Sequence, residues 1–466
     1  MELRDFAERI LFASTIEEKP ACPEVIKGRT PSVFWFNPFA EGRIAQGKSF
    51  TPKKQQVALA GDLANLPQFL CRQDDVVLVA KRPAVGFLSM VKEAGFPLPE
   101  FIELEEGAIA PASSLRQRKI GGLRPWAWGP DSVELLGPLF ANWSGKPRSE
   151  SQCFNEGIAQ LYSKAWSAAL LKEVLSRWAG ESWLCAEGEA GVAVSSVEAA
   201  LEAIEAIRRR GHHRVVAKEA HGLAGHNAMR LWEPEVLESQ RRWMGSAVAR
   251  GRQLVIEPWL ERAADFSVQL EMGARDLKLR GFTGLVNDPR GQFQANWAAA
   301  NYARGIPARV TAMFPAPPDC AMRIQRLYED IRALLQDQLR RVGYVGPVSI
   351  DAFVYQPTPG VFRLKPIVEI NPRYTMGRLA VELMRQAAPG SCGVLRLVNR
   401  AMAKAEGFAD FAVYARALGQ RFPLGLEGAP TRKIRSGALC LNDPAPAQTC
   451  LAVFRVGRAP DEILAG

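Results

Sequence analysis

The chain has 466 residues, of which 47% are apolar and 23% are charged, an ordinary composition for a globular protein. Its length predicts roughly two to four domains, and 11 Trp with 22 Phe exclude a largely disordered chain. The net charge of +10 favours an anionic partner such as a nucleotide or a phosphorylated substrate, although a mildly basic surface explains it equally well.

The cysteines and the first residues of the chain indicate a cytoplasmic protein. The eight cysteines are scattered without CxxC or other metal-ligand spacing, so we interpret them as reduced thiols, and only four histidines are present. The first 15 residues, MELRDFAERILFAST, are charged and lack the long apolar region of a secretion signal. No window approaches the roughly 18 consecutive apolar residues of a membrane span, so we expect no membrane partner.

Residues 1–150 are predicted to form a small α/β domain. Strand-like runs at 32–40 and 75–83 end in turn-forming residues, and a short helix that stops at Gly95 leads to a further strand. This alternation of strand, helix and strand predicts a parallel sheet. The segment 122–132, rich in Gly, Pro and Trp, is interpreted as a loop near the domain boundary.

The pattern changes near residue 155, where helices with apolar residues at spacings of three and four begin. A helix is predicted at 162–178, and a second at 195–211 is capped by Ser195 or Ser196 and ended by Gly211. The remaining predicted elements are the strands 214–218, 253–260 and 265–272, a hairpin at 277–297 that turns at 288–291, an amphipathic helix at 320–343, the strands 347–355 and 362–371, one helix after about residue 400, and a strand at 449–457.

A glycine-rich stretch follows a predicted strand that ends in Lys218. Gly222 and Gly225 let backbone N–H groups close around an anion, and the lysine adds a point charge for phosphate. His221 and His226 flank the glycines and are interpreted as solvated loop residues. The spacing matches neither a Walker loop nor a GxGxxG motif, so a surface turn with a chance lysine is the alternative.

The segment LVIEPWLERAADFSV, 254–268, combines a strand, a hinge and a later acid. The extended backbone after Glu257 offers carbonyl and N–H groups to a purine edge, while Trp259 and Leu260 can wall its face. Asp265 can accept hydrogen bonds from ribose hydroxyls. The alternative is a strand exit that contains proline and exposes its acids to solvent.

Two acids are predicted to face each other across the last strand pair. If that hairpin turns near Gly360, Asp351 and Glu369 fall opposite one another and repel unless a proton or a cation lies between them. With the amide oxygen of Asn371 they form an oxygen-only set, which selects Mg²⁺ or Mn²⁺. Arg373 follows and can hold a developing negative charge. An acid pair on the solvent side of the sheet is the alternative.

In this order the motifs resemble those of the ATP-grasp superfamily, which includes D-alanine–D-alanine ligase, biotin carboxylase and glutathione synthetase. The resemblance covers about residues 160–385 and ends in an E-x-N-x-R segment. The chain departs from the D-alanine ligases at Ser349, where those enzymes carry arginine. Its two acids are also separated more widely than usual, with Pro357, Pro359 and Gly360 between them. No subfamily is identified.

The resemblance implies an α/β (α+β) architecture. An ATP-grasp domain at 151–400 would follow a Rossmann-like α/β domain at 1–150 and precede a short C-terminal extension at 401–466. Within the ATP-grasp domain, the resemblance implies a flap subdomain at about 180–250 and a metal-binding subdomain at about 251–400.

The resemblance also implies a role for each candidate residue. For ATP, these are Lys164 (with Lys172 as a competitor) and Lys218 on the phosphates, Gly222 and Gly225 in the phosphate flap, Glu257, Trp259 and Leu260 at the adenine hinge, and Asp265 on the ribose. For magnesium or manganese, they are Asp351, Glu369 and Asn371, and for the reacting carboxylate they are Arg373 with Arg280.

The reaction that the resemblance implies is ATP-dependent ligation of a carboxylate to an amine through an acylphosphate. Amino acids or short peptides are the expected substrates, and a homodimer is compatible with the family. A kinase acting on a hydroxyl, or a non-catalytic protein that binds nucleotide or nucleic acid, are the alternatives. The intact Asp351, Glu369 and Asn371 speak against a nucleic-acid partner.

Overall fold

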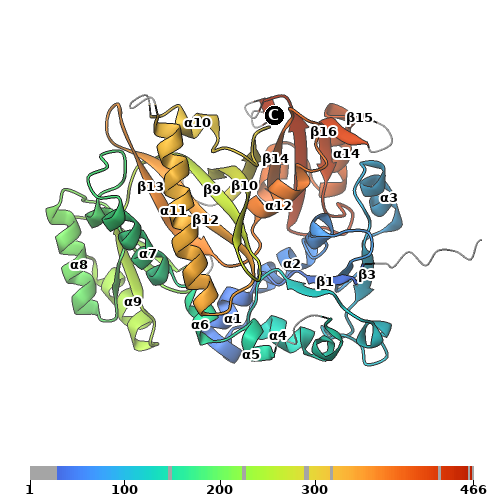
Figure 1. Ribbon diagram of the computed structural model, residues 1–466, viewed down its shortest axis with the longest axis horizontal. Coiled ribbons are helices and arrows are strands. Elements are labelled where there is room, and N and C mark those ends of the chain that lie inside the picture. The colour runs from blue at the N-terminus through green and yellow to red at the C-terminus, as the bar shows by residue number, and fades with distance from the viewer. Residues whose placement is uncertain are drawn as a thin grey trace, which may run out of the picture.

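The computed structural model describes residues 29–144, 149–222, 227–287, 293–314, 319–428, 432–459 and 462–463. These residues form a mixed α/β protein with one parallel and two antiparallel sheets, which confirms the fold class expected from the sequence. Figure 1 shows three parts: an N-terminal part in blue and teal, a small sheet flanked by α8 and α9, and a large sheet crossed by the long helix α11.

The N-terminal sheet is parallel and has the strand order β3-β2-β1-β4, as the alternation of strands and helices predicts. The strands β1, β2, β3 and β4 span Ser32–Trp35, Val76–Val79, Glu100–Glu103 and Gly122–Pro125. The helices α1 to α6 span Ala40–Gln46, Lys54–Asp62, Val85–Glu93, Pro130–Leu136, Glu150–Cys153 and Glu156–Gln160.

The interpretation of 122–132 as a loop is wrong at both ends of that segment. Gly122–Pro125 form the edge strand β4, which pairs with β1, and α4 begins at Pro130. Proline is tolerated at the end of an edge strand and in the first turn of a helix, because its missing N–H is not needed at either place. The prolines therefore mark the ends of regular elements here.

The small antiparallel sheet has the order β5-β8-β6-β7, and its helices α8 and α9 lie at one side of the molecule (Figure 1). Its strands β5, β6, β7 and β8 span Val192–Val194, Val215–Glu219, Ala228–Leu231 and Leu254–Pro258, and α8 and α9 span Val197–Arg209 and Glu238–Ala249. The predicted cap is confirmed: the Ser196 side chain accepts a hydrogen bond from the Ala199 N–H. Gly211 follows α8 with φ of 91°.

The large antiparallel sheet has nine strands in the order β13-β12-β9-β10-β11-β14-β17-β16-β15. These strands, β9 to β17 in chain order, span Arg262–Met272, Leu277–Asn287, Phe293–Ala298, Gly346–Thr358, Val361–Asn371, Cys392–Asn399, Gly425–Glu427, Lys433–Cys440 and Cys450–Gly457. The predicted hairpin of β10 and β11 is confirmed, while its turn at 288–291 lies outside the described residues. The residues after 400 add the last strands to this sheet.

Different helices cover the two faces of the large sheet. The long helix α11 (Cys320–Arg341) buries its predicted apolar stripe against one face, and α7 (Lys164–Arg177) lies beside it. On the other face α12 (Met376–Leu383) approaches closely, because a Cβ on Gly377 would lie 2.4 Å from the Gln269 amide nitrogen. The helices α10, α13 and α14 span Ala308–Thr311, Arg400–Ala405 and Phe411–Arg421.

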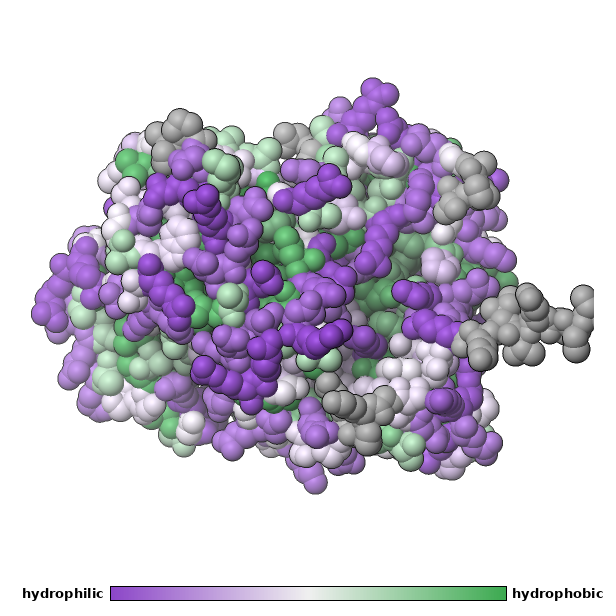
Figure 2. Space-filling view, in the orientation of Figure 1, coloured by the Kyte–Doolittle hydropathy of each residue, from purple (hydrophilic) through white to green (hydrophobic). Residues whose placement is uncertain are grey.

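The face of the molecule seen in Figure 2 is largely polar. Figure 2 shows hydrophilic side chains over most of one face, with hydrophobic residues visible mainly in its hollows. None of the helices in the described ranges is long and apolar enough to cross a membrane.

Replacing Leu335 by Ala is expected to lower the free energy of unfolding by about 2–5 kcal/mol, because its fully buried side chain would leave a cavity between α11 and the sheet. Leu334 is the matched control, since it lies on the same helix but is only partly buried. Urea unfolding of both variants measures the difference. Equal losses for the two variants would show that the packing of α11 differs from this description.

Candidate active site

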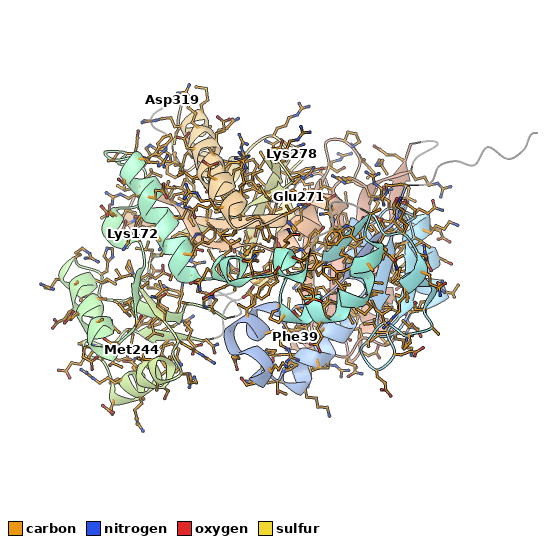
Figure 3. The ribbon with its side chains drawn as sticks, turned by 60° about the horizontal axis from the view of Figure 1, so that its bottom comes forward. Phe39, Lys172, Met244, Glu271, Lys278 and Asp319 are labelled. Carbon is orange, nitrogen blue, oxygen red and sulfur yellow. The ribbon has the colours of Figure 1, made fainter. Side chains whose placement is uncertain are left out.

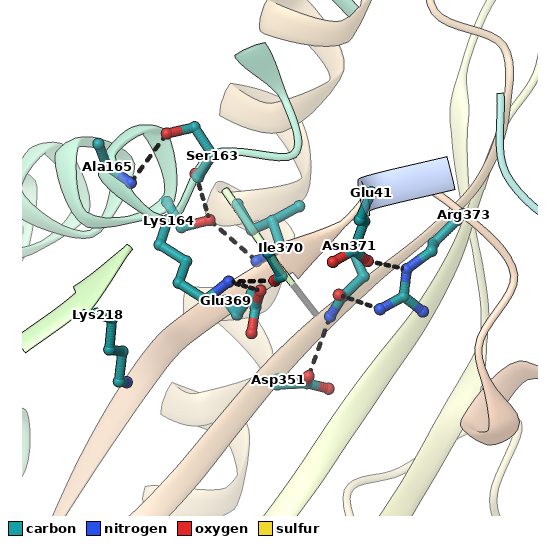
Figure 4. A network of polar contacts seen from close by, with 12 residues as sticks. Glu41, Ser163, Lys164, Ala165, Lys218, Asp351, Glu369, Ile370, Asn371 and Arg373 are labelled. Atoms are coloured by element: carbon teal, nitrogen blue, oxygen red, sulfur yellow. Dashed lines mark hydrogen bonds and ion pairs between the residues drawn. The ribbon is translucent and has the colours of Figure 1, made fainter. Parts of the chain in front are cut away.

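A small pocket lies where the small sheet, the start of α7 and the strand β13 meet. Figure 4 shows in close-up the polar network that extends from its residues Lys164 and Glu369 to Arg373. The residues that line the pocket are Lys164, Ala168, Gly191, Lys218, Val255, Glu257, Lys365, Ile367, Val368 and Glu369. Three lysines and two glutamates therefore converge from elements that are far apart in the sequence.

Lys164 is the first residue of α7, whose N-terminus is capped by the Ser163 side chain. Its ammonium lies 3.0 Å from a carboxylate oxygen of Glu369 and donates a hydrogen bond of 2.9 Å to the Gly222 carbonyl. Burial would lower the pKa of Lys164, but the charge of Glu369 raises it above its usual value. Lys172 projects from α7 elsewhere (Figure 3) and does not line the pocket.

Glu257 lies between two lysines. Lys218 contacts one of its carboxylate oxygens, and Lys365 donates a hydrogen bond of 2.8 Å to the other. Glu257 is only 8% exposed. Burial opposes ionisation, yet Lys218 and Lys365 hold the pKa of Glu257 well below its usual range. Glu257 is therefore ionised and binds the ammonium groups of both lysines.

Asp351 and Glu369 face each other, as the predicted hairpin requires. Their Cα atoms are register partners in β12 and β13, and Gly360 takes a φ of 80° at the turn. Burial and the charge of Glu369 raise the pKa of Asp351 to about 6. Burial would also raise the pKa of Glu369, but Lys164 lowers it below its usual value.

Asn371 links these acids to Arg373. Its amide nitrogen donates to Asp351 over 3.0 Å, and its amide oxygen accepts from the Arg373 guanidinium over 3.0 Å. Arg373 also donates to a carboxylate oxygen of Glu41, on α1 of the N-terminal part, over 2.5 Å. Figure 4 shows Arg373 between Asn371 and Glu41. Burial would lower the pKa of Arg373, but the charge of Glu41 raises it, so the guanidinium stays charged.

The donors around Asp351 fit a hard divalent cation. Asp351, Glu369 and Asn371 offer oxygen ligands, which Mg²⁺ and Mn²⁺ prefer. The raised pKa of Asp351 indicates that burial and the charge of Glu369 disfavour its ionised form. A bound divalent cation would offset this cost. Among the described residues no group of three or more His, Cys, Asp or Glu is arranged to hold a metal, and the Asn371 amide oxygen that would complete the predicted set accepts a hydrogen bond from Arg373.

The predicted adenine hinge follows β8. Trp259 is half-buried, and its ring meets that of Trp232 at 5.9 Å between centroids, while Leu260 is buried in the main hydrophobic core. Asp265, the predicted ribose acid, is half-buried on β9 and forms an ion pair of 2.8 Å with Arg262. None of these three residues belongs to the lining of the small pocket.

The remaining candidates are placed as follows. Gly222 takes a φ of 147° and approaches Lys164 through its carbonyl, whereas Gly225 and His226 lie outside the described residues. Arg280 is half-buried on β10, and its Nε has no hydrogen-bond partner among the described residues.

Sequence reasoning missed two charged residues of this site, Lys365 and Glu41. Lys365 is 2% exposed and lies in the same apolar run as Glu369, while Glu41 is 6% exposed and follows β1. Each is a charge within or just after a strand-like run. The same signal singled out Glu369, and it would have found both residues.

Replacing Asp351 by Asn is expected to stabilise the metal-free protein by roughly 1–2 kcal/mol at pH 7.5. The pKa of about 6 in the folded state exceeds the ordinary value of 3.8, so ionisation of Asp351 destabilises the fold as pH rises through this window. The gain should therefore shrink as pH falls from 6 towards 4.

Urea unfolding of wild type and variant across pH 4–8 tests this, with the exposed Asp337, on α11, replaced by Asn as the control. A gain that does not depend on pH would show that Asp351 carries no such cost.

Comparisons with known proteins give no sequence match but several solved structures of low similarity. No family model and no curated protein matches the chain. N5-carboxyaminoimidazole synthetase from Staphylococcus aureus, solved with ADP, is 11% identical over 94% of this chain and 95% of its own, with a TM-score of 0.48. Biotin carboxylase from Campylobacter jejuni, solved with β,γ-ATP, is 12% identical over 94% and 90%, with a TM-score of 0.48.

An L-amino acid ligase from Bacillus licheniformis is 10% identical over 94% of this chain and 96% of its own, with a TM-score of 0.44. Identities of 10–12% with TM-scores below 0.5 do not assign an activity. The residues of this chain therefore carry the functional proposal.

Proposed function

We propose that the chain is a cytoplasmic ATP-grasp enzyme that joins a small carboxylate to an amine at the expense of ATP. The observation that carries this proposal is the convergence of Lys164, Lys218 and Glu369 in the lining of one pocket, with Asp351 opposite Glu369 on the neighbouring strand. Ammonium groups beside an oxygen-only metal set are what a magnesium–triphosphate substrate requires. Amino acids or short peptides are the proposed substrates.

In this proposal each part of the chain has one task. Lys164 and Lys218 would hold phosphate oxygens, and Asp351, Glu369 and Asn371 would hold magnesium, which when bound would supply positive charge for the transferring phosphoryl group. The segment 180–250 acts as the flap and 251–400 carries the metal site. Trp259, Leu260 and the hinge backbone contact the adenine. Asp265 gives up its ion pair with Arg262 and accepts hydrogen bonds from the ribose.

The reaction then proceeds in two balanced steps. A carboxylate oxygen of the substrate bonds to the γ-phosphorus as the bond to ADP breaks, which gives an acylphosphate. The amine nitrogen next bonds to the acyl carbon, phosphate leaves, and the amine loses a proton to solvent. Arg373, already held by Glu41 and Asn371, orients the carboxylate and stabilises the oxyanion.

Release of ADP, measured with Mg²⁺ over a panel of amino acids and short peptides, tests this function. A ligase requires both a carboxylate and an amine for ADP release. Release with a hydroxyl compound alone would identify a kinase. Absence of turnover together with steeply salt-dependent RNA binding would replace the enzyme by a nucleic-acid-binding protein.

A further inference from the structure

Among the residues that line the pocket, positive charges outnumber negative charges by one. Three of its lining residues are lysines and two are glutamates. Lys164 pairs with Glu369, so the remaining carboxylate, that of Glu257, is shared by Lys218 and Lys365. Two ammonium groups on one carboxylate leave a single charge available to an anionic ligand.

The two lysines on Glu257 differ in their access to solvent. The Lys218 side chain is 21% exposed and comes from β6 of the small sheet, whereas that of Lys365 is 3% exposed and comes from β13 of the large sheet. Lys365 also donates to the Glu189 carbonyl over 3.1 Å, and its ammonium lies 6.0 Å from the centre of the Phe353 ring. Lys218 is therefore the lysine whose ammonium can leave Glu257 and bind a ligand.

A local irregularity of β13 lies beside Lys365. The register between β12 and β13 shifts between the pairs Asp351–Glu369 and Phe353–Lys365, where β13 contains Pro366. Proline supplies no N–H to a ladder and is found at such bulges. From this strand Glu369 contacts Lys164 and Lys365 contacts Glu257.

The pairing of Lys365 with Glu257 matters because a buried carboxylate without a counter-ion destabilises the protein. If Lys218 were the only partner of Glu257, its transfer to phosphate would leave an unpaired buried charge, which is strongly unfavourable. With Lys365 in place, Glu257 keeps an ion pair and a hydrogen bond throughout.

We propose that Lys365 is a positioning residue, the permanent counter-ion of Glu257 that frees Lys218 to bind the phosphates of the nucleotide. The proposal rests on the proposed function, since it concerns the same pocket. It assigns a role to a lysine that touches the nucleotide only through another residue.

Calorimetric titration with Mg²⁺ and ADP of wild type, Lys365→Met, Glu257→Gln and the double variant tests this role. Lys365→Met is expected to weaken ADP binding roughly 10- to 100-fold, because Lys218 then stays with Glu257. In the Glu257→Gln background the same substitution should have little further effect, because no carboxylate then holds Lys218. The exposed Lys278, replaced by Met, is the matched control (Figure 3).

One further variant keeps the test decisive. Lys365→Arg should retain near wild-type affinity, and Glu257→Gln added to Lys365→Met should regain most of the lost affinity, because neither buried charge then remains unpaired. Equal weakening by Lys365→Met with and without the Glu257 carboxylate would overturn the proposal, and so would no weakening at all. If the wild-type protein binds no ADP, the proposed function is wrong, and the role proposed for Lys365 is then wrong as well.

Discussion

Glu369→Gln is expected to reduce turnover by about 10³-fold or more while the protein stays folded. The change keeps the size of the side chain but removes the charge that Lys164 contacts at 3.0 Å and that the proposed metal site needs. A loss of about 4 kcal/mol in transition-state stabilisation corresponds to that factor, and one carboxylate on a metal and a lysine can supply it.

The measurement is steady-state ADP release, with thermal unfolding as the check on folding. Glu173→Gln is the matched control, because Glu173 is an exposed acid on α7 that pairs with Arg177 at 2.7 Å, away from the pocket. Wild-type rates in the Glu369 variant would remove this residue from the active site.

Arg373→Met is expected to lower both stability and turnover. The guanidinium is the partner of Glu41, which is only 6% exposed, so its removal leaves a buried carboxylate unpaired at a cost of about 3–5 kcal/mol. It also frees the Asn371 oxygen and removes the group that orients the substrate carboxylate, so turnover should fall by about 10²-fold or more.

A second substitution separates the two effects. Adding Glu41→Gln to Arg373→Met should restore most of the stability, because no unpaired charge remains, but none of the turnover. Urea unfolding and ADP release measure the two quantities, and the exposed Arg385, on the surface beside Glu382, replaced by Met is the control. Recovery of turnover in the double variant would show that Arg373 serves only to neutralise Glu41.

Local patterns predicted much of the fold. The apolar spacing of α8 and α11 and the cap at Ser196 lie within short windows of sequence, where periodicity and capping chemistry are sufficient. The predicted opposition of Asp351 and Glu369 is confirmed, but two register irregularities lie between this pair and the turn at Gly360, and the sequence did not predict them.

Contacts between distant segments were not predictable. The Lys365–Glu257 bond joins residues 108 apart, and the Arg373–Glu41 bond joins residues 332 apart, so both depend on how whole sheets are placed. The pairing of β11 with β14, which carries the chain beyond residue 400 into the large sheet, is of the same kind. A single sequence contains no local signal for which strands become neighbours.

The pairing of β11 with β14 also decides which strands share one backbone ladder. The nine strands from β13 to β15 form one sheet, so the acidic hairpin and the C-terminal strands belong to the same sheet. The small sheet has its own ladder, and the side-chain bond from Lys365 to Glu257 joins it to the large sheet. Because Glu257 belongs to the small sheet and Lys365 to the large one, their ion pair also holds the small sheet against the acidic hairpin.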